Sequence, residues 1–435
     1  MTGAHVRAQY QPIGGSPQRA GVTASPTDTV FACRSCGSTD VGVFLALGMS
    51  PLANGILKPG FEHEEKTFPL DVGFCRRCSL VQLTFAPPPE DLFLDYPYFS
   101  SFSDAMVEHA RRLTAKLTHE RGLDGNSLVV ELASNDGYLL RFYRDAEIPV
   151  LGIEPALNIA EVARDRGIET ISEFFDADVG ALLAAEGRRA DVIHAHNVLA
   201  HVPDLNGFVL GIKTLLKPNG IAVIEVPYLR DLIENTEFDT IYHEHLSYFS
   251  LTALERLFSR HGMKIIDAER VAIHGGTLRI TVGHDTNREE PRASVAGVLA
   301  EEGELGMTAE SYYRDFRWRV ETLKSNLIAC LSGLKAEGHQ IAGYGASAKG
   351  TTLLTYCGIG TNYLDFLVDR STAKQGHLAP GSHLPIYRPE HLVQANPDYT
   401  LLLVWNFADE ILAQQAEYRS RGGKFIVPVP SVRVV

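Results

Sequence analysis

Short apolar runs alternate with helical patterns through the middle of this 435-residue chain. Residues 128–132 predict a buried strand, followed by a turn of small polar residues over 133–137 and a helix over 138–143. Further strands are predicted at 150–153, 169–171, 191–195 and 221–226, the last of them after a turn at 216–220. This alternation of strands and helices predicts an open, mainly parallel sheet.

A second set of elements follows a long helical pattern over residues 309–337. Strands are predicted at 340–344, 364–368 and 401–405, with a helix over 353–356. The C-terminal part is therefore expected to be a second, smaller Rossmann-like unit in an α/β protein. The expected division is a disordered leader at 1–28, an N-terminal lobe at 29–90, a central domain at 91–290 and a C-terminal domain at 291–435.

Length and composition agree with several soluble globular domains, since 435 residues exceed one typical core. The net charge of −13 argues against nucleic acid or an anionic membrane as the main partner. No apolar run reaches the length of a membrane span, and the start of the chain lacks the apolar core of a signal peptide. Residues 1–28 are rich in Gly, Pro, Ser, Thr and Gln, which favours disorder.

Four of the six cysteines form two pairs with a two-residue gap, Cys33/Cys36 and Cys75/Cys78. Each pair can place both thiolates on one ion, and two pairs complete a tetrahedral zinc site with no open position. The sequence therefore predicts structural zinc, with Gly37 permitting a tight turn and an inserted loop over residues 47–68. Disulfides are the alternative, but no secretory signal supports them. Cys330 and Cys357 are expected to be buried apolar residues.

Acidic residues follow two of the predicted strands, in the order expected for a nucleoside-binding fold. The turn after the first strand lacks the glycine spacing of a dinucleotide loop, and Glu154 at the end of the second strand can accept hydrogen bonds from ribose hydroxyls. This acidic site favours S-adenosylmethionine, which is cationic at sulfur and has no pyrophosphate. Another nucleoside ligand is the alternative. The candidate donor-binding residues are Glu131, Ser134, Asn135, Asp136, Gly137, Glu154 and Asn197.

Small residues, hydroxyls and one lysine follow the first strand of the C-terminal unit. Together with the start of a helix they can bind an anion such as a diphosphate, although the spacing is not that of a Walker loop. Tyr344, Ser347 and Lys349 are the candidate residues. The alternative is that Lys349 is a solvated loop charge.

The segment Tyr242-His243-Glu244-His245 carries the chemistry of proton transfer. Histidine exchanges protons near neutral pH, and a nearby phenol or carboxylate can orient its ring. A helix start with two surface histidines is the alternative. Tyr96 and Tyr98, after the proline-rich residues 87–89, can form a lid or simply pack between domains.

Together these motifs resemble the sugar C-methyltransferases of deoxysugar biosynthesis. The resemblance covers about residues 30–435 and rests on the order of the cysteine pairs, residues 131–137, 152–155, 200–204, 242–250, 274–279 and 343–350. It implies a zinc lobe, a central class I methyltransferase domain, and a C-terminal domain for the nucleotide sugar. It also implies a bacterial cytoplasmic enzyme that methylates C3 of a dTDP-linked 4-keto-deoxysugar.

The resemblance also implies roles for individual residues. His245 is the expected base, with Glu244 orienting its neighbours, and Tyr242, His201 or Tyr98 is expected to donate to the C4 oxygen. His243 is expected to be structural, while His274 and Arg279 are candidates for substrate contact. Two departures from the family are the long leader and Ala133, which replaces a usual glycine and is harmless if its φ is negative.

Other functions stay open on the sequence alone. An O- or N-methyltransferase acting on a sugar nucleotide or related sugar would use the same base on a hydroxyl or amine. A non-catalytic nucleotide-sugar binding protein is disfavoured because the acidic loop and His245 are present, and a dehydrogenase because the dinucleotide glycines are missing. The expected partner is the nucleotide sugar, and the expected state is a monomer or weak homo-oligomer.

Overall fold

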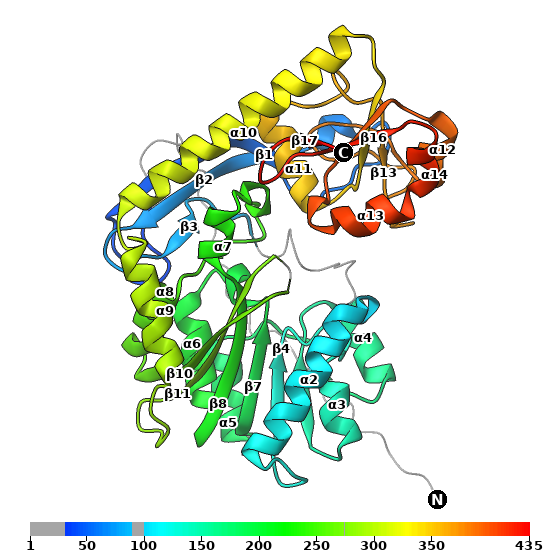
Figure 1. Ribbon diagram of the computed structural model, residues 1–435. Coiled ribbons are helices and arrows are strands. Elements are labelled where there is room, and N and C mark those ends of the chain that lie inside the picture. Colours follow the sequence, from blue (N-terminus) through cyan, green and yellow to red (C-terminus); the bar gives the residue numbers. More distant parts are fainter. Residues whose placement is uncertain (1–30, 89–99, 274) are drawn as a thin grey trace, which may run out of the picture. The chain divides into compact units, whose positions relative to one another are not determined.

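The computed structural model describes residues 31–88, 100–273 and 275–435 (Figure 1). Residues 32–435 form one compact unit whose strands gather into three sheets. The predicted leader at 1–28, and the candidates Tyr96, Tyr98 and His274, lie outside the described residues. Three sheets with intervening helices confirm the predicted α/β class.

The central sheet has seven strands in the order β10-β11-β8-β7-β4-β5-β6. Strands β8, β7, β4, β5 and β6 run parallel to their neighbours among themselves, and β11 is antiparallel to both β8 and β10. The predicted mainly parallel sheet is therefore confirmed. Its strands are β4 (Val129–Leu132), β5 (Val150–Ile153), β6 (Thr170–Ile171), β7 (Ala190–His196), β8 (Leu216–Pro227), β10 (Met263–Val271) and β11 (Thr277–His284).

Alternating side chains of this sheet enter two different cores. Val130, Ile193 and Ile224 pack with α5, α6 and α8, whereas Val129, Val192 and Val223 pack with α2 and α3. Both faces are covered, which explains why these strands are continuous apolar runs. The helices of this part are α2 (Asp104–Arg121), α3 (Leu140–Asp145), α4 (Leu157–Asp165), α5 (Ala177–Ala185), α6 (Leu205–Leu215), α7 (Leu229–Glu234) and α8 (Leu251–Arg260).

The cysteine lobe contains an antiparallel sheet in the order β1-β2-β3-β9, made of β1 (Val41–Pro51), β2 (Thr67–Cys75), β3 (Val81–Leu83) and β9 (Ser247–Tyr248). The last strand comes from far along the chain. The predicted loop at 47–68 is wrong at both ends, since only residues 52–66 separate β1 from β2. Leu45 and Leu47 enter a core shared with the later helix α10, and Gly48 has a φ of 83° at a bulge, so the chain stays extended.

The C-terminal part contains a six-stranded sheet in the order β14-β13-β12-β15-β16-β17, parallel except for β17. Its strands are β12 (Ile341–Tyr344), β13 (Leu367–Val368), β14 (Ile386–Tyr387), β15 (Tyr399–Leu402), β16 (Lys424–Val427) and β17 (Arg433–Val434). The helices from this part and the preceding segment are α9 (Ala293–Glu304), α10 (Glu310–Ala336), α11 (Ala348–Cys357), α12 (Glu390–Ala395), α13 (Ala408–Gln414) and α14 (Ala416–Ser420).

Several predicted boundaries differ from the structure. The helix predicted over residues 353–356 already begins at Ala348, where Ser347 caps it, and the strand predicted over residues 364–368 is reduced to Leu367 and Val368. Residues 216–220 belong to β8, because Leu216 pairs with Ala190 before an irregularity brings Ile221 opposite Val192. Strand β15 ends at Leu402, and Trp405 begins a short 3-10 turn instead of closing the strand. The predicted domain boundaries stay predictions. No helix among the described residues is long and apolar enough to cross a bilayer.

Candidate active site

The four paired cysteines come together in space. Their sulfur atoms lie within 4.8 Å of one another, with 3.5 Å between Cys33 and Cys78 and 3.6 Å between Cys36 and Cys75. Four sulfurs bound tetrahedrally to zinc at ~2.3 Å would stand about 3.8 Å apart, so this set fits one zinc ion. All six cysteines of the chain are free thiols in the structure, which agrees with metal binding and not with disulfides.

The two cysteine pairs sit in turns of the same form. The Cys33 N–H donates to Ser38 and the Cys75 N–H donates to Leu80, at 2.8 and 2.9 Å. The residue after each pair has positive φ, 70° at Gly37 and 62° at Ser79. The tight turn predicted from Gly37 is confirmed, and the second pair reaches the same turn with serine.

Residues 133–137, the turn predicted to bind the methyl donor, follow β4 and have a strained backbone. Ala133 and Asn135 have φ values of 53° and 49°. The departure at Ala133 is therefore not harmless, because a left-handed φ costs a non-glycine residue roughly 1–2 kcal/mol. Asn197, after β7, has a φ of 53° and its N–H donates to the carbonyl of Glu225 at 2.9 Å. Such strain gathers where a backbone must approach a ligand.

Acidic side chains around this loop are buried and incompletely hydrogen-bonded. Among the residues that the structure describes, one oxygen of Glu131, the Ser134 hydroxyl and one oxygen of Asp136 have no hydrogen-bond partner. Burial, together with the charges of Glu154 and Asp136, raises the pKa of Glu131 well above its usual range. Glu154 accepts backbone N–H groups of Asn135 and Ala156, both at 2.9 Å. A cationic ligand would lower the cost of burying this cluster, so these residues fit S-adenosylmethionine.

His245 is fixed at both ring nitrogens. Its Nδ1 lies 2.9 Å from the carbonyl oxygen of Thr240, and its Nε2 lies 3.1 Å from the hydroxyl of Tyr242. A carbonyl only accepts, so Nδ1 carries the proton and Nε2 presents its lone pair. Burial, followed by the charge of His201, lowers the pKa of His245 to about 3. The ring is therefore neutral near pH 7, in the form that can accept a proton.

The other residues around His245 fall into two groups. The His201 ring lies 4.9 Å from the His245 ring, and burial lowers its pKa to about 4. His243 and Glu244 instead contact the cysteine lobe, His243 Nε2 at 3.2 Å from the Pro69 carbonyl and Glu244 accepting from Asn54 at 2.7 Å. These contacts accord with the structural role expected for His243.

The C-terminal candidates lie at the start of α11. The Ser347 hydroxyl accepts from the Gly350 N–H at 3.1 Å and caps the helix, while Tyr344 is buried at the end of β12. The Lys349 ammonium lies 4.8 Å from the centre of the Trp405 ring, and Trp405 donates to Asp239 at 2.6 Å. Lys349 is thus in contact with an aromatic ring, and its charge also acts on His245.

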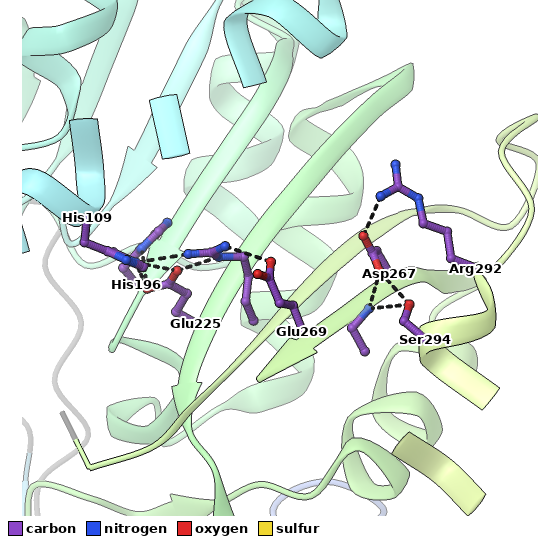
Figure 2. A network of polar contacts seen from close by, with 9 residues as sticks. His109, His196, Glu225, Asp267, Glu269, Arg292 and Ser294 are labelled. Carbon is purple, nitrogen blue, oxygen red and sulfur yellow. Dashed lines mark hydrogen bonds and ion pairs between the residues drawn. The ribbon is translucent and has the colours of Figure 1, made fainter. Parts of the chain in front are cut away.

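The structure places Arg279 in a separate cluster, within the central domain. Its guanidinium lies 2.7 Å from Glu225 and 3.0 Å from Glu269, and 3.1 Å from His109 Nε2. Figure 2 shows His109, His196 and Glu225 converging, with Glu269 beyond them. His109, His196 and Glu225 have the spacing of a cation site, but Arg279 already supplies the positive charge there.

A chain of polar contacts continues from Glu225 into the domain. His196 Nδ1 lies 3.1 Å from Glu225, His194 Nδ1 lies 2.9 Å from His196 Nε2, and Tyr143 lies 3.0 Å from His194 Nε2. One proton assignment satisfies both hydrogen bonds, with Tyr143 donating to His194 and His194 donating to His196. His196 Nδ1 lies at ion-pair distance from Glu225 but has no hydrogen-bond partner among the described residues. Burial raises the pKa of Glu225, but His196, His109 and Arg279 outweigh it and hold the pKa well below its usual range.

Replacing Arg279 by methionine should lower the free energy of unfolding by about 3–5 kcal/mol, because Glu225 would keep its buried charge without its permanently charged partner. The exposed fractions of the two side chains are 12% and 1%. Urea unfolding followed by circular dichroism measures the change.

The matched control is Arg292→Met, since Arg292 also pairs with an aspartate of β10, Asp267, at 2.7 Å but is 55% exposed (Figure 2). Exposed pairs contribute about 0–1 kcal/mol, so this variant should stay close to wild type. Equal effects of the two substitutions would show that Arg279 is not a buried partner of Glu225.

Several residues near His245 were not predicted from the sequence. Asp239 is fully buried, and burial raises its pKa to about 6 and that of Glu237 to about 7, against the effect of Lys349. Thr240 contacts His245 through its backbone carbonyl, and Trp405 reaches Asp239 from the turn that follows β15. Only the position of Asp239 and Thr240, shortly before Tyr242, could have suggested them.

Known protein families and one close relative match most of the chain. A methyltransferase domain matches residues 106–268, a C-methyltransferase C-terminal domain matches residues 272–430, and a zinc binding domain matches residues 33–93. The C-methyltransferase NovU of Streptomyces niveus is 41% identical over 406 residues, which is 93% of this chain and 96% of NovU. The chain belongs to the C-methyltransferase family.

Other similarities cover less than half of this C-methyltransferase. A ubiquinone biosynthesis O-methyltransferase of Burkholderia pseudomallei is 24% identical over 176 residues, 37% of this chain and 74% of that protein. The glycopeptide N-methyltransferase MtfA with S-adenosylmethionine aligns with a TM-score of 0.33 and 13% identity, over 46% of this chain and all of MtfA. S-adenosylmethionine and structural zinc are the cofactors of the C-methyltransferase, as the sequence predicts.

Proposed function

We propose that this C-methyltransferase methylates C3 of a dTDP-linked 4-keto-deoxysugar after removing the C3 proton. The observation that carries the proposal is the geometry of His245. Its Nδ1 is anchored on the Thr240 carbonyl, so the unprotonated Nε2 faces the hydroxyl of Tyr242. A neutral imidazole in this position is suited to take a proton from a carbon made acidic by an adjacent ketone.

The proposed first step moves one proton and one electron pair. The C3–H bond breaks, the proton goes to Nε2 of His245, and the electron pair forms an enolate across C3, C4 and the C4 oxygen. An imidazolium is costly where the pKa of His245 is about 3. The enolate anion beside it offsets that cost, because an opposite charge favours the protonated ring. The Thr240 carbonyl also accepts from the imidazolium.

Tyr242 is the proposed donor to the developing enolate oxygen. In the structure its hydroxyl points to Nε2 of His245 at 3.1 Å. When the substrate carbon takes this place at Nε2, the hydroxyl is released toward the C4 oxygen, where a preorganised donor lowers the barrier. His201, whose ring packs against that of His245, and Tyr98 are further candidates for this role.

The residues of the donor site would align S-adenosylmethionine, the methyl donor, with the acceptor carbon. Bound S-adenosylmethionine supplies an electrophilic methyl group. The acidic residues Glu131 and Asp136 would hold its positive charge, Glu154 its ribose, and Ser134, Asn135, Gly137 and Asn197 its remaining polar groups. Holding donor and acceptor in line contributes much of the rate enhancement in such reactions.

The C-terminal domain is the proposed site of the nucleotide. Lys349, with Ser347 at the start of α11 and Tyr344 nearby, would hold the diphosphate. Arg279 is left out of this proposal because its guanidinium binds Glu225 and Glu269.

Turnover in D₂O with S-adenosylmethionine and a panel of dTDP-4-keto-deoxysugars tests the function. We expect the product to gain one methyl group and to lose the hydrogen of the acceptor carbon, measured by mass spectrometry and NMR. Methylation on oxygen or nitrogen, with the carbon hydrogens kept, would replace the proposal by an O- or N-methyltransferase. Donor binding without any methylated product would exclude the proposed substrates.

The low pKa of His245 gives a pH prediction. Because burial lowers the pKa, the neutral form persists on acidification, and the ring should stay neutral from about pH 8 to about pH 5, where an ordinary histidine would titrate. Long-range ¹H–¹⁵N NMR measures the state of the ring, with its signal assigned by its loss in His245→Asn. Titration of that signal within this window would contradict the prediction.

A further inference from the structure

The segment that carries His245 continues into the sheet of the cysteine lobe. Strand β9 begins at Ser247 and pairs antiparallel with β3, with Gln82 opposite Ser247 and Val81 opposite Tyr248. The N–H of Leu83 also donates to the carbonyl of Leu246 at 2.9 Å. His245 is therefore followed directly by three residues whose backbone positions are set by β3.

The residues on the other side of His245 contact the same lobe. The His243 ring reaches the carbonyl of Pro69 in β2, and the Glu244 carboxyl accepts from Asn54 between β1 and β2. Both side chains are buried, with exposed fractions of 1% and 5%. The backbone around His245 is thus held on both sides by the lobe that contains the four cysteines.

Gln82 connects this strand to the metal site. Its side chain is completely buried, its Nε2 donates to the sulfur of Cys33 at 3.1 Å, and its Oε1 accepts the N–H of Arg34 at 3.0 Å. Both ends of the amide are therefore used by the first cysteine pair. A metal-bound thiolate is a stronger acceptor than a thiol, and partners of this kind orient metal ligands.

We propose that Gln82 is a positioning residue that couples the four-cysteine zinc site to the backbone around His245. Zinc fixes Cys33, Cys33 fixes the Gln82 amide, and β3 carries this constraint to β9 and His245. The assignment of His245 as the base rests on the proposed function, whereas the coupling itself does not. A displacement of about 1 Å at a reacting group can lower a rate about 10²-fold, so a small shift of β9 is enough to affect turnover.

The test is Gln82→Leu in the full chain, which removes both amide hydrogen bonds and keeps the side-chain size similar. Thr84→Val is the matched control, because Thr84 follows β3 and, among the described residues, its hydroxyl donates to the Asp71 carbonyl alone, at 3.5 Å. The readouts are zinc release to a chromogenic chelator, hydrogen–deuterium exchange over residues 240–250, affinity for S-adenosylmethionine, and turnover in saturating zinc.

In Gln82→Leu we expect zinc release to accelerate about 10–100-fold, as for other partners of metal ligands. Exchange over residues 240–250 should rise, exchange over residues 150–165 should not, and donor affinity should stay within about twofold while kcat falls about tenfold or more. Thr84→Val should resemble wild type in every readout.

Two results would overturn the proposal. Unchanged zinc release would show that the amide does not support the metal site, and unchanged exchange over residues 240–250 would show that the lobe does not hold the His245 segment. Zinc release and exchange do not depend on the substrate. Coupling seen in an enzyme that methylates none of the proposed sugars would therefore contradict the proposed function alone.

Discussion

Replacing His245 by asparagine should leave binding of S-adenosylmethionine intact and lower turnover by about 10²–10⁴-fold, the usual contribution of a proton-transfer residue. An asparagine amide can still donate to the Thr240 carbonyl in place of Nδ1, so the local backbone keeps its contact. The lone pair of Nε2 has no equivalent in the variant. Calorimetric titration with the donor and steady-state turnover measure the two effects.

The matched control for this substitution is His119→Asn, because His119 is exposed in the last turn of α2. It should have the turnover of the wild type. A loss of less than about tenfold in His245→Asn, with donor affinity unchanged, would remove His245 from the proton-transfer step.

Replacing Cys75 by serine should abolish zinc binding and unfold the cysteine lobe. Cys75 ends β2, and its sulfur lies 3.6 Å from that of Cys36. Binding of zinc to such a site contributes on the order of 10 kcal/mol to folding, and a lobe the size of residues 32–88 cannot replace this with its own core. Metal content by mass spectrometry should fall from one zinc per chain to nearly none, and the thermal midpoint should fall with it.

Cys330→Ser separates this effect from the general cost of losing a thiol. Cys330 lies in α10, half-buried beside a core that the lobe shares, and has no part in the four-cysteine cluster. It should keep one zinc per chain and a thermal midpoint near that of the wild type. A Cys75→Ser protein that retains zinc and its thermal midpoint would exclude Cys75 as a ligand.

Local patterns in the sequence were sufficient to predict most of the fold. The strands that became β4, β5, β7 and β12 are short apolar runs between turn residues, and such runs report burial directly. The errors came where tertiary contacts decide the conformation. Leu47, at the start of the predicted loop, extends β1 because it packs into a core shared with α10. The pairing of Ser247 and Tyr248 with a distant sheet depends on a partner strand more than a hundred residues earlier.

The candidate site also contains contacts that a local motif predicts and contacts that only the tertiary structure decides. The Tyr242–His245 contact joins residues three apart, so it could be predicted from a local motif. Asp239 and Trp405 meet only because two distant segments fold together, and no spacing rule relates them. The family resemblance implies substrate contact for Arg279, yet Arg279 lies opposite Glu225 in the sheet. Cross-strand neighbours of this kind depend on strand order, which local patterns do not give.

The polar residues beneath the central sheet also bear on how the strands find their alignment during folding. Glu225 faces His196 on β7 and Arg279 on β11, and Arg279 faces Glu269 on β10. Shifting any of these strands by one residue would turn its charge to the opposite, apolar face. Apolar residues alone would tolerate such a shift more easily, since valine, isoleucine and leucine are nearly interchangeable in a core. The charged row therefore selects one alignment of four strands, and with it the position of the donor-site candidate Asn197 directly after β7.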